Sequence, residues 1–322
     1  MPLGPGAEFD RVRRIAAALG PRAAGLGDDC AVLAAGDANL VASTDVSVEG
    51  VHFRREWLSL DEIGWRATAA ALSDLAAEGA DAAGVLVALT VPASAREDDV
   101  VAVMMGAGDA ALDAGARLVG GDLSAGPLWS VAVTVLGWAR TPVTRAGARP
   151  GDGLWVTGAL GGARAALEAW RRGVEPSGEA RRAFAHPLPR LRAGHWLARH
   201  GARAMIDVSD GLGADAAHLA AASGVGLAIE LERVPVAAAA RDEAARLGIA
   251  PERFAAESGE EYGLLVVLPP HFEGDDVLAF RSAAGLELTR VGAARAGAGV
   301  QATLGGAAVT LAGYDHFAPR DR

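Results

Sequence analysis

Acidic residues of this 322-residue chain recur in six short motifs, each beside a glycine or a small hydroxyl residue. Several motifs fall where the hydropathy pattern predicts the end of a strand or the start of a turn. Carboxylates there point into the loops where α/β proteins bind ligands, and a neighbouring glycine lets a phosphate approach the backbone. Mg²⁺ prefers such oxygen ligands and usually bridges one or two carboxylates to a substrate phosphate. The motifs are Gly27-Asp28-Asp29-Cys30, Ser43-Thr44-Asp45, Leu72-Ser73-Asp74-Leu75, Gly120-Gly121-Asp122, Asp207-Val208-Ser209-Asp210-Gly211 and Ser258-Gly259-Glu260-Glu261-Tyr262.

Each motif taken alone also fits an ordinary structural role. Asp and Ser are preferred helix N-caps and Gly-Asp pairs form turns, so Asp210 before a predicted helix is a plausible cap. Asp74 lies inside an apolar helical pattern, where an unpaired carboxylate is costly to bury. A metal ion, an arginine or exposure on the polar face of the helix would each compensate it. His52, which follows the Asp45 motif, fits either a contact to an anionic substrate or a solvated loop.

The composition excludes several other chemistries. The chain has no lysine, so all 30 basic residues are arginine, and a P-loop, a protein kinase and a pyridoxal phosphate enzyme are excluded. The net charge of −10 opposes binding to nucleic acid or to an anionic membrane. A single cysteine, Cys30, excludes an internal disulfide, and no apolar run is long enough to span a membrane. The first 14 residues lack the apolar stretch of a secretory signal, so we expect a cytoplasmic protein.

The motifs must be positioned by the elements between them. Short β-branched runs alternate with alanine-rich helical patterns, which indicates an α/β protein. Residues 139–153 hold two prolines, three glycines and three arginines without apolar periodicity, which is typical of a linker. We therefore expect domains over 1–140 and 154–322, joined by a linker over 141–153. Helices are predicted over 8–19, 61–77, 96–114, 162–172, 188–199, 212–222, 237–247 and 272–284, and strands over 40–43, 85–91, 128–137, 154–157, 226–231, 263–268, 286–291 and 309–311.

In this order, the motifs resemble those of the thiamine-monophosphate kinase family, in the superfamily of aminoimidazole ribonucleotide synthetase and selenophosphate synthetase. The resemblance runs nearly end to end, and it is extended by Gly79-Ala80-Asp81, Thr144-Arg145, Pro150-Gly151-Asp152 and Gly313-Tyr314-Asp315-His316-Phe317. It implies a two-domain, synthetase-like fold of the α/β (α+β) type. An N-terminal mixed sheet would pair across a homodimer, and a C-terminal α/β domain would complete the substrate site.

The resemblance also implies an activity: in-line transfer of the γ-phosphate of ATP to thiamine monophosphate, assisted by several Mg²⁺ ions, to form thiamine diphosphate. The acceptor phosphate is already ionised at neutral pH, so no general base is required. Arg145 would act as a charge stabiliser in place of lysine. The residues implied are Asp29, Ser43, Thr44, Asp45, Asp74, Asp122, Asp207 and Asp210 for metal; Gly121, Asp122, Arg145 and Ser209 for nucleotide; and His52, Glu260 and Tyr314 for substrate, with Tyr314 stacking on a heterocycle.

The chain departs from the family pattern in three places. Residues 113–115 lack the tyrosine that often contacts the nucleotide, Leu123 replaces a common threonine, and Glu261 stands where aspartate is usual. Two other functions stay open: a nucleotide- and metal-binding maturation or scaffold protein, and another ATP-dependent synthetase of the superfamily. His52, Glu260 and Tyr314 favour the kinase over both.

Overall fold

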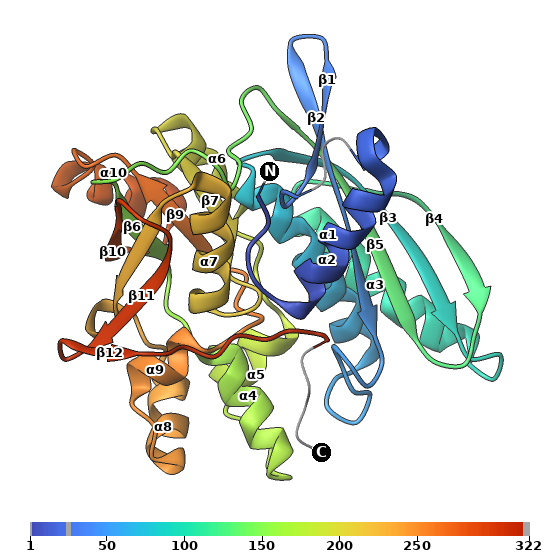
Figure 1. The fold of residues 1–322 in the computed structure, drawn as a ribbon. Helices are drawn as coiled ribbons and strands as arrows, with labels where there is room; N and C mark the ends of the chain where they lie inside the picture. The colour runs from blue at the N-terminus through green and yellow to red at the C-terminus, as the bar shows by residue number, and fades with distance from the viewer. Residues whose placement is uncertain (1, 24–26, 318–322) are drawn as a thin grey trace.

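Two β-sheets, both packed against helices, form the framework of the chain (Figure 1). The computed structural model describes residues 2–23 and 27–317. The first sheet has the order β1-β2-β5-β3-β4, in which only β3 and β4 are parallel. Its strands are β1 (Ala31–Ala35), β2 (Ala38–Val48), β3 (Asp81–Val91), β4 (Leu118–Ala125) and β5 (Ser130–Ala139).

Helices α2 (Leu60–Ala77) and α3 (Glu97–Asp113) pack against each other and α2 also packs on the first sheet. Valines 131, 133 and 135 of β5 are fully buried, whereas the residues between them are half-buried, because side chains alternate across a strand. The two helices approach closely at glycines. A Cβ on Gly64 would lie 1.8 Å from the carbonyl oxygen of Val103, so α2 could not pack as it does with any larger residue there.

The second sheet has seven strands in the order β12-β11-β8-β10-β6-β9-β7. All residues of β6 and β9 are buried, as expected for strands inside a sheet covered on both faces. Its strands are β6 (Gly153–Thr157), β7 (Ala204–Asp207), β8 (Gly226–Glu230), β9 (Leu264–Leu268), β10 (Leu288–Arg295), β11 (Gly299–Leu304) and β12 (Ala307–Val309). The helices of this half are α4 (Gly162–Arg171), α5 (Gly178–Ala185), α6 (Leu191–Arg199), α7 (Leu212–Ser223), α8 (Ala238–Leu247), α9 (Pro251–Ala256) and α10 (Gly274–Ala284).

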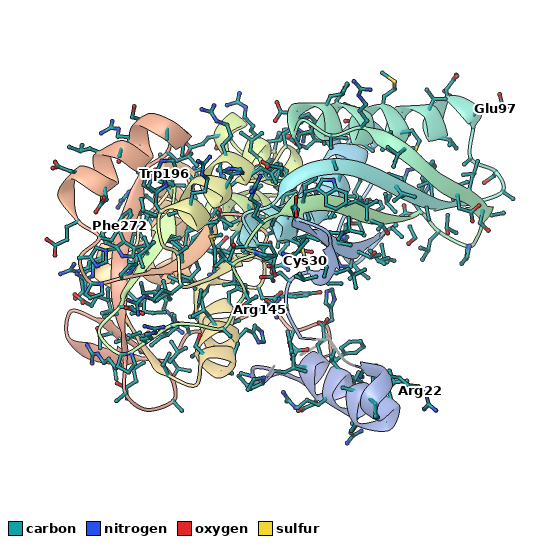
Figure 2. The ribbon with its side chains drawn as sticks, turned by 90° about the horizontal axis from the view of Figure 1, so that it is seen from above. Arg22, Cys30, Glu97, Arg145, Trp196 and Phe272 are labelled. Carbon is teal, nitrogen blue, oxygen red and sulfur yellow. The ribbon has the colours of Figure 1, made fainter. Side chains whose placement is uncertain are left out.

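Helix α2 joins the two halves, because it contacts β2 and β5 on one side and α5, α6 and β7 on the other. Seen from above, Cys30 and Arg145 lie at the centre of the molecule, with Glu97 and Phe272 toward opposite ends (Figure 2). Helix α1 (Ala7–Leu19) lies beside the C-terminal segment, where the guanidinium of Arg11 is 3.8 Å from the ring centroid of Phe317. Within the described residues, no helix combines the length and apolar character that crossing a membrane requires.

The predicted fold class is confirmed, and all eight predicted helices are present. Among the strands and α-helices of the described residues, six were missed: β1, β4, β7, β11, α5 and α9. One strand boundary matters for the site: β2 continues to Val48, so the Ser43-Thr44-Asp45 motif lies in the middle of a strand and not at its end. Strand β4 was missed because nearly all of its residues are exposed and it contains two glycines, so it has no apolar alternation. The Gly120-Gly121-Asp122 motif is therefore also inside a strand.

Candidate active site

Three carboxylates from distant parts of the chain meet between the two halves. Asp29 precedes β1, Asp74 lies in α2 and Asp207 ends β7. One oxygen atom from each lies within 4.8 Å of the others. Both Asp29 and Asp207 are almost fully buried, with exposed fractions of 3% and 4%. A buried set of oxygen atoms this close together fits a hard divalent cation such as Mg²⁺.

Hydroxyl groups of serine residues hold two of these carboxylates in place. Ser43 of β2 donates a hydrogen bond to Oδ2 of Asp74, and Ser73 of α2 donates one to Oδ2 of Asp207. Asp45 is on the same face of β2 as Ser43, because it is two residues away along the strand. Asp74 thus faces other carboxylates and not solvent, which is opposite to the exposed-helix alternative.

The electrostatics of the cluster favour a cation. Burial raises the pKa of Asp74 well above its ordinary value, and the nearby Asp45, Asp207 and Asp29 raise it further. Burial and neighbouring carboxylates likewise raise the pKa of Asp45 to about 6 and that of Asp207 to about 8. Asp210, buried near Glu260, has its pKa raised to about 7. Positive charge placed among these groups would relieve both desolvation and mutual repulsion.

Arg145 lies at the edge of the cluster and is paired with it. Its Nε atom donates to Oδ1 of Asp29 at 3.1 Å, and its main-chain N–H donates to Oδ1 of Asp28 at 3.1 Å. These carboxylates and burial of the side chain, 14% exposed, hold the guanidinium in one place. The predicted role of Arg145 in nucleotide binding remains a prediction, whereas its pairing with Asp29 is direct.

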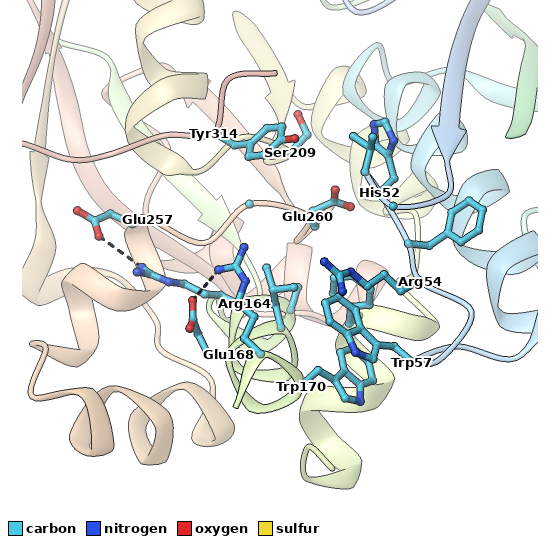
Figure 3. Close-up of a pocket in the computed structure, with 18 of the residues that line it drawn as sticks. His52, Arg54, Trp57, Arg164, Glu168, Trp170, Ser209, Glu257, Glu260 and Tyr314 are labelled. Atoms are coloured by element: carbon cyan, nitrogen blue, oxygen red, sulfur yellow. Dashed lines mark hydrogen bonds and ion pairs between the residues drawn. The ribbon is translucent and has the colours of Figure 1, made fainter. Parts of the chain in front are cut away.

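A pocket of about 580 Å³ lies next to the Asp207–Gly211 motif, which contributes Ser209 to its lining (Figure 3). The three clustered carboxylates are not themselves among its lining residues. All three predicted substrate residues line it, His52, Glu260 and Tyr314, together with the predicted nucleotide residue Ser209. Main-chain hydrogen bonds connect Glu260 and Tyr314 to the Asp207–Gly211 motif. The N–H of Glu260 donates to the carbonyl oxygen of Ser209 at 2.7 Å, and the N–H of Tyr314 donates to that of Asp210 at 3.0 Å. Residues far apart in the sequence therefore form one wall.

The Glu260 side chain is held by Arg66 and Tyr262, which both donate hydrogen bonds to its Oε2 atom. Glu260 and Tyr262 have positive φ angles of 64° and 51°, a conformation that non-glycine residues adopt rarely and that clusters at functional sites. Glu261, the residue that departs from the family pattern, faces away and caps α4: its Oε1 accepts hydrogen bonds from the N–H groups of Gly161 and Ala163. Glu261 thus caps the N-terminus of α4.

His52 is oriented by a hydrogen bond from its own loop. Val48 N–H donates to its Nδ1 atom at 3.1 Å, so Nδ1 is an acceptor and Nε2 carries the proton. Burial lowers the pKa of His52, which favours this neutral form. A neutral histidine with its Nε2–H free of that bond can donate to an oxygen of a bound anion.

Not every predicted site residue lies at the cluster. Thr44 points to the opposite face of the first sheet, where its hydroxyl shares a hydrogen bond of 2.8 Å with that of Thr134. Gly121 and Asp122 are exposed on the edge strand β4, separated from β2 by β5 and β3. A Cβ on Gly121 would lie 1.9 Å from the carbonyl oxygen of Val87, so strand pairing alone already requires glycine there.

Sequence reasoning missed the residues that support the site: Arg66, Ser73 and the pocket residues Trp57 and Trp170. Arg66 had a usable signal, because an arginine in an apolar helix seven residues before Ser73 lies on the same helical face. The two tryptophans had none, since nothing in the sequence relates them to each other.

The chain matches family profiles over both of its halves and is similar to known proteins along most of its length. The profile of the AIR synthase related protein N-terminal domain matches residues 27–139, and that of the C-terminal domain matches residues 149–305. The chain is 39% identical over 246 residues to the thiamine-monophosphate kinase of Mycobacterium tuberculosis, covering 75% of this chain and 73% of the relative. It is 33% identical over 330 residues to that of Salmonella typhimurium, covering 96% of each.

Solved structures are also similar to this chain along most of its length. The structure of AaThiL complexed with AMPPCP and TMP has a TM-score of 0.87 at 30% identity and covers 97% of both chains. The hydrogenase maturation protein HypE in complex with ATP has a TM-score of 0.71 at 19% identity, covering 88% of this chain and 87% of that one. At that identity the likeness to HypE concerns the fold alone.

Proposed function

The chain belongs to the thiamine-monophosphate kinase family of AIR synthase related proteins, and from this membership we propose that it phosphorylates thiamine monophosphate (TMP) with ATP. The reaction forms thiamine diphosphate by direct transfer of the γ-phosphate. One observation carries the assignment to this site: Ser209, two residues after Asp207 of the carboxylate cluster, lines the same pocket as His52, Glu260 and Tyr314. A phosphate ester bound in the pocket can thus present its phosphate to the cluster.

We propose that Asp29, Asp74 and Asp207 hold Mg²⁺, with Ser43, Asp45 and Asp210 beside them. Carboxylate oxygens are the ligand type that this ion prefers, and the raised pKa values of Asp74 and Asp207 are consistent with a site that favours positive charge. Bound there, Mg²⁺ would neutralise the charge of two phosphate groups that otherwise repel each other. The site thus offers several carboxylate oxygens close together, as the binding of a metal ion requires.

The residues of the chain itself have simple tasks in this reaction. The acceptor phosphate is ionised at neutral pH and attacks without a general base. Neutral His52 donates from Nε2 to an oxygen of the bound ester, while Arg66 and Tyr262 fix the Glu260 carboxylate beside it. Arg145 orients Asp29 and adds positive charge at the edge of the cluster. Catalysis then consists of positioning and charge neutralisation.

We further propose that the protein is a homodimer in which Gly121 and Asp122 serve the site of a second copy. In their own chain they lie on an edge strand that is separated from β2 by two other strands, β5 and β3. The outward face and edge of this sheet expose apolar side chains that a second copy would cover: Val46 is 48% exposed, Val119 59% and Leu123 60%. A dimer formed through this sheet would also explain why Thr44 points outward.

Mixing two inactive variants tests this arrangement. Asp74→Asn and Asp122→Asn, mixed one to one and allowed to exchange subunits, should recover about a quarter of wild-type activity, because half of the dimers would be mixed and each would hold one intact site. Each variant alone is the control. Absence of recovery despite subunit exchange, measured by mass spectrometry with one isotopically labelled variant, would contradict the shared site.

The activity itself is tested with purified protein, ATP, Mg²⁺ and TMP, with thiamine diphosphate measured by chromatography. Formation of thiamine diphosphate together with one ADP per turnover is expected. ATP consumption without thiamine diphosphate would instead favour a synthetase or maturation protein of the superfamily. The division into domains over 1–140 and 154–322 and a cytoplasmic location, which the single cysteine Cys30 supports, are also part of this proposal.

A further inference from the structure

One end of the substrate pocket is lined by aromatic side chains that have no role in the proposed reaction. Trp57 and Trp170 line this end, on the side away from Ser209 and Tyr314 (Figure 3), and Leu167 also lines the pocket. The indoles of Trp57 and Trp170 are stacked, with ring centroids 5.5 Å apart and planes 5° apart. Trp170 in turn packs edge-on against Phe184, with centroids 5.3 Å apart.

Burial of Trp170 and main-chain hydrogen bonds of Trp57 hold this stack in place. Trp170 is 7% exposed and belongs to the core of the second half, while Trp57 is half-buried at the pocket. The main chain of Trp57 is held on both sides: its N–H donates to Arg54 O at 3.0 Å, and its carbonyl accepts from Nη1 of Arg181 at 3.0 Å. A tryptophan fixed in this way loses little freedom when a ligand ring packs on it.

A planar side-chain group of the protein lies on the Trp57 ring. The Arg54 guanidinium is 4.8 Å from the ring centroid. Its one side-chain hydrogen bond in the described part of the chain is to Glu56 at 3.5 Å, and the side chain is 52% exposed. A flat group with so weak an attachment is easily exchanged, so the face that it covers is accessible to a flat ring of the ligand.

We infer that Trp57 is the specificity-determining platform on which the aminopyrimidine ring of TMP stacks. The inference rests on the proposed function and follows from the order of groups along the substrate. TMP carries its phosphate at one end, the cationic thiazolium in the middle and the aminopyrimidine at the other end. With the phosphate at the carboxylate cluster, the thiazolium lies near the Glu260 carboxylate and the aminopyrimidine reaches the aromatic end.

Stacking on Trp57 is present before and during phosphoryl transfer, so it contributes to binding and not to the chemical step. Trp57→Leu, which keeps an apolar side chain without a ring face, should raise KM for TMP about tenfold, as expected for the loss of one aromatic stacking contact. It should leave kcat and KM for ATP within about twofold. Trp57→Phe retains a ring face and should restore KM to within about threefold of wild type.

A truncated substrate separates stacking from general damage. The phosphate ester of N-methylated hydroxyethylthiazolium keeps the cationic ring and the phosphate but lacks the aminopyrimidine. Trp57→Leu should change kcat/KM for this ester by less than about twofold, because it has no group on the platform. Trp65→Leu is the matched control: it replaces a half-buried tryptophan outside the pocket and should preserve the preference for TMP over the ester.

The possible outcomes are distinct. A decrease in kcat/KM of Trp57→Leu for TMP but not for the truncated ester supports the role of Trp57 as a stacking platform. Equal losses on TMP and the truncated ester, or no loss on either, would overturn it while wild-type turnover of TMP leaves the proposed function intact. A wild-type protein that forms no thiamine diphosphate from TMP and ATP would refute the inference together with the function on which it rests.

Discussion

Replacing Asp74 by asparagine should separate the stability of the fold from the function of the cluster. Asp74 is the residue of the cluster whose alternative roles are most different, a metal ligand or an exposed helical residue. In the structure it accepts a hydrogen bond from Ser43 and lies within 4.8 Å of Asp29 and Asp207, measured between carboxylate oxygens. Asparagine keeps the acceptor for Ser43 and removes the charge, so only the electrostatics change.

Two magnitudes follow from this geometry. Two unit charges 4.8 Å apart repel by about 3.5 kcal/mol at an effective dielectric constant of about 20. Burial and the neighbouring Asp45, Asp207 and Asp29 raise the pKa of Asp74, so the fold favours its protonated form, which avoids this cost. Asparagine resembles that protonated form, so the melting temperature of the metal-free variant should stay within about 2 °C of wild type. Activity should fall by about 10²- to 10³-fold, the usual effect of losing one preorganised group that stabilises transition-state charge.

Differential scanning calorimetry and steady-state kinetics measure the two effects. With EDTA the two proteins should melt together, and with saturating Mg²⁺ wild type should gain stability that Asp74→Asn gains only in part. Turnover is followed at saturating Mg²⁺ and both substrates, so that weaker binding does not hide intact chemistry. Near wild-type turnover under these conditions would refute the role of Asp74 as a metal ligand. A variant that unfolds in EDTA while wild type does not would refute the protonation argument.

Three other results are expected. The metal-free protein should lose stability as pH rises from about 4 to 9. The fold raises the pKa values of Asp45, Asp210 and Asp207 from 3.8 to about 6, 7 and 8. The folded state therefore holds these protons more tightly than the unfolded chain, and the stability that they contribute is complete below pH 3.8 and is lost as pH rises through these values. Denaturant unfolding across this range checks the slope, which Mg²⁺ should reduce; stability that rises with pH would contradict it. Tyr314→Ala should raise KM for TMP several-fold and leave kcat and KM for ATP within about twofold, since stacking acts equally in ground and transition states; a lower melting temperature with both KM values moved together would indicate a packing role instead. Free thiamine should be phosphorylated at least about 10²-fold less efficiently than TMP in kcat/KM, because the phosphate of TMP is already ionised at neutral pH whereas an alcohol must first lose its proton. Comparable rates would exclude this explanation.

The chemistry of the site could be predicted from the sequence because it depends on local residue type. Asp74 within an apolar helix and the acidic motifs beside small residues already indicate oxygen ligands for a hard cation, whatever the fold. Helices could be predicted for the same reason, since a period of 3.6 residues is a property of a single segment. The absence of lysine likewise excludes whole classes of phosphate chemistry without reference to structure.

The sequence was least informative where burial is decided by distant segments. Strand β4 lacks alternation because it is an exposed edge, and the position of Asp122 away from the cluster follows from strand order and not from its motif. Adjacent residues Thr44 and Asp45 belong to one motif but point to opposite faces, which is apparent only once β2 is known to continue through them. Pairing, order and extent of strands depend on contacts between segments, and a local pattern does not specify them.

The convergence of groups was decided entirely by tertiary structure. Asp29, Asp74 and Asp207 meet because α2 packs between the first sheet and β7, and the pKa values of Asp74 and Asp207 are raised only once the chain buries them beside other carboxylates. The stack of Trp57 on Trp170 has the same origin, since one residue precedes α2 and the other ends α4. Residue types and their order determine which reactions are available to the chain, whereas distances, burial and electrostatic coupling arise from packing of remote segments and determine which residues act together.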